Sequence, residues 1–214
     1  MTFVVKKVRS SETAGRAHNK VEQKRLFDDL RTGLIIRGLS LTRPCPFAFI
    51  HGPADERKGI ENRKWKPPEK MIGQLMALHS SATYSVEYQK WIAERTGLRV
   101  PDKSDSPKSE IFAVCRLVGY VTSAEDERLP RQQRKWFLGP YAWLLDEIVP
   151  LLTPVACVGG QKLWRLESRP GVVAALKRSY REVTGEDLKL ALDERSQAPN
   201  NFFRDHLSES PVVR

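Results

Sequence analysis

Residues 58–65 (KGIENRKW) bring together the side chains of this sequence that are best suited to chemistry. If the segment is extended, the two-residue period of a strand places Glu61, Arg63 and Trp65 on one face and the intervening residues on the other. A carboxylate, a guanidinium and an indole on one face are typical either of a concave polar site or of a buried ion pair. The segment therefore predicts one of these two arrangements.

The polar members of this cluster have groups that could contact a nucleic-acid base. The Glu61 carboxylate could accept hydrogen bonds from a base N–H, or it could instead anchor Arg63 in a bidentate pair. The Asn62 amide can donate and accept at once, which suits a base edge. A structural ion pair that ties one strand to its neighbour is an equally good interpretation of Glu61 and Arg63.

Other residues could complete such a site. Trp65 or Trp143 could stack on an unpaired base, and Lys58 and Lys162 could hold phosphates. His79, which ends an apolar segment and precedes Ser80, could donate to a carbonyl or titrate near neutrality. The structural alternatives are a core position for Trp143, which lies in an apolar strand, and a buried, hydrogen-bonded role for His79.

The charge of the chain favours a polyanionic partner. The 214 residues include 36 Lys and Arg against 26 Asp and Glu, a formal net charge of +10, and the isoelectric point is near 9.7. Residues 1–25 contain seven of the basic groups and two acidic ones. This segment predicts a flexible or partly helical arm that either contacts phosphates or merely aids solubility.

The remaining composition excludes several classes. Cys45, Cys115 and Cys157 are widely spaced, without a CxxC pair, so we expect neither a disulfide framework nor a metal site, and no cofactor motif is present. No apolar stretch is long enough for a membrane span or a signal peptide, so we expect a cytoplasmic protein with no membrane partner.

The hydrophobic pattern predicts several strands with few helices, hence an α+β fold built on a small, partly open β-barrel of mixed strands. Gly97 and Gly119 predict a helix end and a strand bend. We expect strands at 34–41, 58–65, 73–79, 111–122, 139–145 and 155–166, helices at 21–30, 47–50, 84–95, 172–183 and 186–194, and loops at 101–110, which we expect to be mobile, and 125–135.

The order of these motifs resembles the ASCH domain, a member of the PUA-like superfamily that includes the YTH and EVE modified-base readers. The resemblance covers residues 34–167 and leaves a basic arm at 1–33 and a helical extension and tail at 168–214. It rests on a short apolar helix ending in Gly52 and on the later elements Lys58-x-x-Glu61-Asn62-Arg63-x-Trp65, His79-Ser80, Gly139-x-Tyr141-Ala-Trp143 and Lys162-Leu-Trp164.

The resemblance implies a PUA-like barrel of five to six mixed strands decorated by helices, with a cleft that binds RNA or DNA. Some members are hydrolases of modified cytidine or of RNA, and the amidohydrolase type uses a Lys, a Thr three residues later and a Glu on a later strand. Here Lys58 is followed three residues later by Glu61, and the strand at 111–122 has no internal glutamate. This departure favours binding over catalysis.

We therefore predict a nucleic-acid-binding module that recognises a base or nucleotide, modified or not, of RNA or DNA. The alternative is a small hydrolase of a modified nucleoside or of RNA, in which Lys58, Glu61 and His79 come together if the strands at 58–65 and 73–81 pair. The full predicted binding set is Lys58, Glu61, Asn62, Arg63, Trp65, His79, Ser80, Tyr141, Trp143 and Lys162. A vestigial cleft in a protein-interaction adaptor remains a third possibility.

Overall fold

The computed structural model describes residues 37–166 and 168–184, which belong to one compact unit of the chain. The predicted arm at 1–33, with its helix at 21–30, lies outside the described residues. So do the predicted helix at 186–194 and the C-terminal tail.

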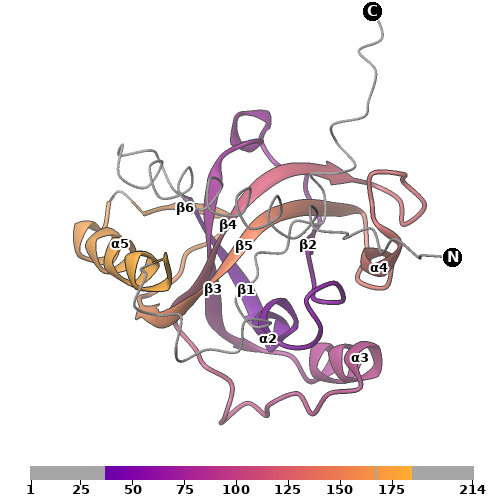
Figure 1. Cartoon of the computed structure of the whole chain (residues 1–214), viewed down its shortest axis with the longest axis horizontal. Helices are drawn as coiled ribbons and strands as arrows, with labels where there is room; N and C mark the ends of the chain where they lie inside the picture. Colours follow the sequence, from indigo (N-terminus) through magenta and orange to yellow (C-terminus); the bar gives the residue numbers. More distant parts are fainter. Residues whose placement is uncertain (1–36, 167, 185–214) are drawn as a thin grey trace, which may run out of the picture. The chain divides into compact units, whose positions relative to one another are not determined.

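The described residues form a six-stranded mixed sheet with helices, which confirms the predicted α+β fold class (Figure 1). The strand order is β2-β5-β4-β3-β1-β6; β1 and β3 are parallel and the other neighbours antiparallel. Between the described strands no ladder joins β2 to β6, so the hydrogen-bonded sheet is open. The strands are β1 (Arg37–Arg43), β2 (Ile60–Arg63), β3 (Leu75–Tyr84), β4 (Glu110–Val121), β5 (Tyr141–Ala156) and β6 (Leu163–Arg165).

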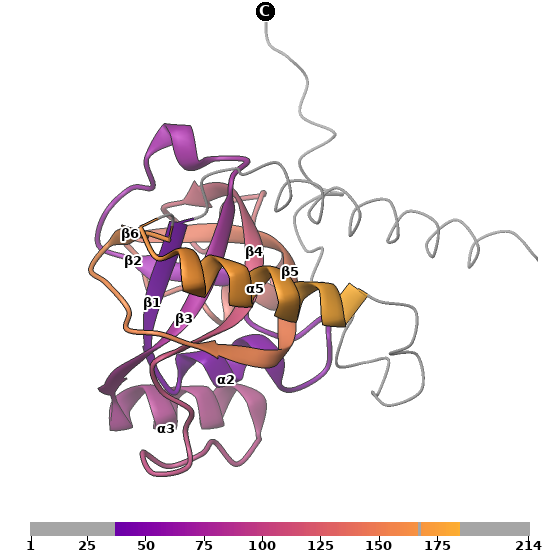
Figure 2. The same cartoon turned by 90° about the vertical axis from the view of Figure 1, so that its left-hand side faces the viewer.

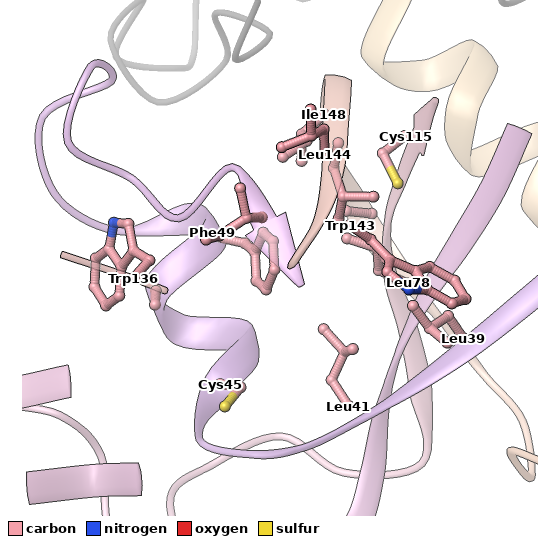
Figure 3. Packing of buried hydrophobic residues seen from close by; sticks show 14 of the residues in the cluster. Leu39, Leu41, Cys45, Phe49, Leu78, Cys115, Trp136, Trp143, Leu144 and Ile148 are labelled. Atoms are coloured by element: carbon pink, nitrogen blue, oxygen red, sulfur yellow. The ribbon is translucent and has the colours of Figure 1, made fainter. Parts of the chain in front are cut away.

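The core lies between the sheet and the short helix α2 (Cys45–Ile50). Alternation along β1 and β3 turns Leu39, Leu41 and Leu78 into it, and Trp143 of β5 lies beside Leu39 and Leu78 (Figure 3). The apolar runs of β3 and β4 are buried in strands that have a neighbour on both sides for much of their length. Residues 142–149 of β5 are buried as well, although only the start of this strand is paired on both sides.

One strand is longer than predicted, because β5 continues through the segment where we expected a break between 145 and 155. Glu147 adopts a positive φ of 49°, and the β4–β5 register shifts at three places, one of them at Gly119 as predicted. The prolines at 150 and 154 are tolerated because β2 pairs β5 only along Tyr141 to Leu144, so the later part of β5 has one neighbour. Of the strand predicted at 155–166, the part that forms a separate strand is β6, Leu163–Arg165.

The helices begin and end where local signals place them. Pro46 occupies the first turn of α2, and α3 (Val86–Thr96) is capped by the Ser85 hydroxyl and ends at Gly97 with a left-handed φ of 68°. Helices α2 and α3 contact each other at one end of the strands, while α5 (Pro170–Thr184) packs on β5 (Figures 1 and 2). The predicted loop at 125–135 contains a short helix, α4 (Arg131–Arg134), and a single 3-10 turn, η1 (Glu69–Met71), precedes β3.

Candidate nucleic-acid interface

The residues around β2 line a small cleft of about 80 Å³ between β1, β2, α2 and α3. Strand β2 is shorter than expected, ending at Arg63 because Lys64 and Trp65 turn away before Pro67 and Pro68. The cleft is lined by Thr42, Cys45, Lys58, Glu61, Asn62, Arg63, Tyr88, Trp91 and Leu138.

The Glu61 carboxylate lies between two cations in this cleft. Its Oε2 accepts from Lys58 Nζ at 2.6 Å, and its Oε1 lies 3.2 Å from an Arg63 nitrogen. Lys58 is 2% exposed and Glu61 7% exposed, and the ammonium also lies 4.8 Å from the centre of the Phe49 ring. The predicted pairing of Glu61 with Arg63 is present, and Lys58 joins it as a third member.

Arg63 also links the two sides of the open sheet. The same guanidinium nitrogen donates to the Ser40 carbonyl at 2.8 Å, which joins β2 at one edge to β1 near the other. Arg63 Nε and Trp91 Nε1 are buried donors with no hydrogen-bond acceptor among the described residues. Such donors are uncommon in folded proteins, and a ligand that offers acceptors would satisfy them.

Asn62 holds the wall of the cleft instead of offering a free amide. Its Nδ2 donates to the Trp136 carbonyl at 2.8 Å, and its Oδ1 accepts from the Leu138 amide at 2.9 Å. Cys45 forms another part of the wall, where burial raises its pKa to about 12 despite the opposing charge of Lys58. This thiol is therefore not a nucleophile at neutral pH.

Sequence reasoning missed Gln133, which fixes the backbone on both sides of Lys58. Its Oε1 accepts from the Gly59 amide at 2.7 Å, and its Nε2 donates to the Arg57 carbonyl at 2.8 Å. The amide of Lys58 itself donates to the Ala48 carbonyl at 2.8 Å. Gln133 lies in a charged segment whose composition predicted a loop, so no local pattern marked it.

Replacing Gln133 by leucine should lower the free energy of unfolding by about 2–4 kcal/mol, because the buried Gly59 amide and the buried Arg57 carbonyl would lose their hydrogen-bond partner. Urea denaturation followed by tryptophan fluorescence measures this change. The neighbouring exposed residue supplies the matched control, since Gln132→Leu should change stability by less than about 0.5 kcal/mol. Equal effects of the two variants would contradict the assigned role.

The aromatic residues of the predicted site belong to the core. Trp143 is 0% exposed; its indole N–H donates to the Trp65 carbonyl at 3.1 Å, and the two rings meet edge to face at 4.6 Å. A fully buried ring has no free face for a base. Tyr141 is half-buried against Tyr120, with ring centres 5.9 Å apart. Tyr88 and Trp91 of α3, which were not among the predicted site residues, are the aromatics that line the cleft.

His79, Ser80 and Lys162 are not part of the cleft. Strand β2 pairs only with β5 among the described strands, so the pairing that would bring His79 to Lys58 and Glu61 does not form. The His79 ring packs edge to face on Trp164, and its Nε2 donates to the Cys157 carbonyl at 3.1 Å. Ser80 donates to the Pro107 carbonyl, and Lys162 is exposed just before β6.

His79 should make stability depend on pH. Burial lowers the pKa of His79 below its ordinary value, and the charge of Arg169 acts in the same direction, against the hydrogen bond to Cys157. The unfolded chain then binds a proton more readily than the folded one, so stability is lost as pH falls below about 6.5. His79→Gln should cost about 1–2 kcal/mol at about pH 7.5 and less at about pH 5.5, measured by urea denaturation. A cost that is the same at both pH values would contradict this role.

The described residues show no group of three His, Cys, Asp or Glu side chains placed to hold a metal ion. Nor does any helix within 37–166 and 168–184 have the length and apolar character needed to cross a membrane.

Comparison with known proteins finds similarity among solved structures. No family model matches the sequence, and no curated protein matches it. The chain is similar to the crystal structure of ASCH from Zymomonas mobilis, with 14% sequence identity and a TM-score of 0.41 over 66% of this chain and 94% of that chain. That structure bears the name of the domain that the order of motifs in this sequence resembles.

Proposed function

We propose that the chain is a nucleic-acid-binding module that takes up an unpaired nucleotide of RNA or DNA in the cleft around Glu61. The observation that carries the proposal is the pair of cations, Lys58 and Arg63, sharing one carboxylate beside two aromatic residues. The three charges leave the cleft with an excess of one positive charge, which suits a phosphate. The aromatic pair, Tyr88 and Trp91, suits a base.

The buried donors of the cleft support the same proposal. Arg63 Nε and Trp91 Nε1 lack acceptors among the described residues, and phosphate or base oxygens would supply them. The net charge of +10 for the whole chain adds long-range attraction to a polyanion. A base that offers an N–H would compete with Lys58 and Arg63 for the Glu61 oxygens. A modification that changes this N–H would change the competition, and the cleft could in this way distinguish a modified base from an ordinary one.

The test measures binding of fluorescently labelled single-stranded RNA and DNA oligonucleotides by anisotropy over a range of salt concentrations. We expect affinity that falls as salt rises and that drops about tenfold in Lys58→Met. Methionine keeps most of the length of the side chain without its charge and leaves Glu61 paired with Arg63. The control is Lys70→Met at an exposed lysine, which should weaken binding no more than about twofold. Absence of binding at low salt, or equal losses in both variants, would refute the proposal.

A hydrolase remains the second candidate because Lys58 Nζ and Glu61 Oε2 lie 2.6 Å apart, close enough to exchange a proton. Against this, Glu61 is the single carboxylate among the described residues that line the cleft, and its two oxygens already contact Lys58 and Arg63. Mass spectrometry of a modified-nucleoside pool and of an RNA, each incubated with the protein, decides between the binding module and the hydrolase. Products that disappear with Lys58→Met would establish the hydrolase.

A further inference from the structure

Residues 157–162 (CVGGQK) connect β5 to β6 and have no ladder partner among the described strands. We call this segment the strap. At its start, the Cys157 amide donates to the Ser109 carbonyl at 2.8 Å. In its middle, the amide and the carbonyl of Gly160 both bond to the Ser40 hydroxyl, at 3.3 and 3.0 Å. A segment outside the ladders, held largely by one side chain, can open without unfolding the rest of the protein.

The strap lies directly on the ring of His79, which is 1% exposed. The ring Nε2 donates to the Cys157 carbonyl, whereas Nδ1 is buried with no hydrogen-bond partner among the described residues. Gly159 fits over this ring because it lacks a side chain: a Cβ there would lie 2.5 Å from His79 Cε1 and 2.6 Å from Nδ1. The closed strap therefore leaves no room for a water molecule between Gly159 and Nδ1.

A second proton on His79 would have no acceptor under the closed strap. Protonation turns Nδ1 from an acceptor into a donor. The Ser40 hydroxyl, which also lies against Gly159, is fully engaged. It donates to the Gly160 carbonyl and accepts from the Gly160 amide and from Trp164 Nε1, the last at 3.1 Å. The imidazolium would thus be a buried charge with an unsatisfied N–H, which is costly.

The charged and titratable groups around this ring do not offset an added positive charge. Burial lowers the pKa of His79, and the like charge of Arg169 acts in the same direction. The Cys157 thiol is neutral at pH 7, because burial raises its pKa. From β4, the Glu110 carboxylate lies opposite Ser80 and hence on the other face of the sheet from His79.

We propose that the strap is a proton-operated switch, in which uptake of a proton by His79 opens residues 157–162 while the six-stranded sheet stays folded. Opening gives the imidazolium access to water. It also breaks the hydrogen bond from Arg169 to the Val158 carbonyl, and it uncovers the Trp164 ring, over which the Arg169 guanidinium lies at 4.6 Å from the ring centre. The open form therefore presents two cations beside an aromatic ring. This inference does not depend on nucleotide binding in the cleft.

The test measures hydrogen exchange of the full chain by NMR at about pH 7.5 and about pH 5.5, with each rate compared with that of the unprotected group at the same pH. Protection of the Gly160 amide and of the Trp164 indole N–H should fall about threefold to tenfold at the lower pH, since one proton is taken up on opening. At both pH values it should stay at least about 100-fold below that of the Val114 amide in the middle of β4, because opening is local.

Two pairs of variants assign the switch to its parts. His79→Gln should abolish the pH response of Gly160, while His51→Gln, at an exposed histidine, should leave it unchanged. Gly159→Ala should open the strap already at about pH 7.5 and lower the protection of Gly160 about tenfold or more, because its Cβ meets the His79 ring. Gly171→Ala is the matched control, since a Cβ at that glycine has no neighbour within 4 Å among the described residues.

Protection of Gly160 equal to that of Val114 would overturn the proposal, because the strap would then open only on global unfolding. Protection that does not change with pH in the unaltered protein would overturn it too, as would a full pH response in His79→Gln. The first two results need no variant, so they decide the question even if His79→Gln does not fold. No oligonucleotide enters the experiment, so its outcome is independent of the proposed function.

Discussion

Replacing Glu61 by alanine is expected to lower the free energy of unfolding by about 3–5 kcal/mol, which is a large part of the stability of a typical domain. The carboxylate is the shared partner of Lys58 and Arg63, and Lys58 is 2% exposed. Without Glu61, a buried ammonium faces a guanidinium with nothing between them. The loss is therefore not that of two surface salt bridges but that of an uncompensated buried charge.

A double-mutant cycle separates this effect from simple loss of packing. Lys58→Met should cost only about 1–2 kcal/mol, because Arg63 remains to pair with Glu61. The loss of unfolding free energy caused by Glu61→Ala should be about 1–3 kcal/mol smaller in the Lys58→Met background than in the unaltered protein. Urea denaturation of the four proteins measures the cycle. Additive costs, or a cost of Glu61→Ala below about 1 kcal/mol, would show that the pair is not held as a buried unit.

Trp143→Ala should lower the free energy of unfolding by about 3–5 kcal/mol, because the ring is fully buried in the core between β1, β3 and β5. The substitution also removes the donor to the Trp65 carbonyl and the edge-to-face contact between the rings. Trp143→Phe, which keeps much of the ring volume, should cost less than the alanine variant. Thermal and urea unfolding measure both.

Trp143→Phe also tests the role in base stacking that the sequence suggested. Since the indole has no exposed face, oligonucleotide affinity of the folded variant should stay within about twofold of the unaltered protein. Trp91→Phe supplies the contrast, because Trp91 lines the cleft and its Nε1 has no acceptor among the described residues. A large loss of affinity in Trp143→Phe alone would return Trp143 to the binding site.

Much of the fold could be predicted because local patterns agreed with tertiary packing. The helix at 86–96 carried a serine cap and a terminal glycine, and the bend at Gly119 followed from a glycine inside an apolar strand. The length of β5 could not be predicted in the same way. Prolines normally end a strand, and they are tolerated here only because no second strand pairs beside them, which is a property of the assembled sheet.

The candidate site was predictable where its members are close in sequence and not where they are distant. Lys58, Glu61 and Arg63 fall within six residues, and the structure brings them together. Tyr88 and Trp91 reach the cleft through the packing of α3 on α2, and no motif links them to β2. His79 was grouped with the site on an assumed strand pairing, and the actual sheet order separates them.

The three cysteines are buried to different extents, so the rate at which each thiol reacts reports the opening of a different part of the protein. Cys157 is half-buried, Cys45 is buried in the wall of the cleft, and Cys115 is inaccessible in the core. A thiol reagent should therefore modify Cys157 first, Cys45 only when the cleft opens, and Cys115 only on unfolding. A nucleotide bound in the cleft should slow labelling of Cys45 alone, as measured by peptide mass spectrometry. The labelling rate of Cys45 thus reports how much of the cleft is occupied, without a fluorescent label on the protein or on the nucleotide.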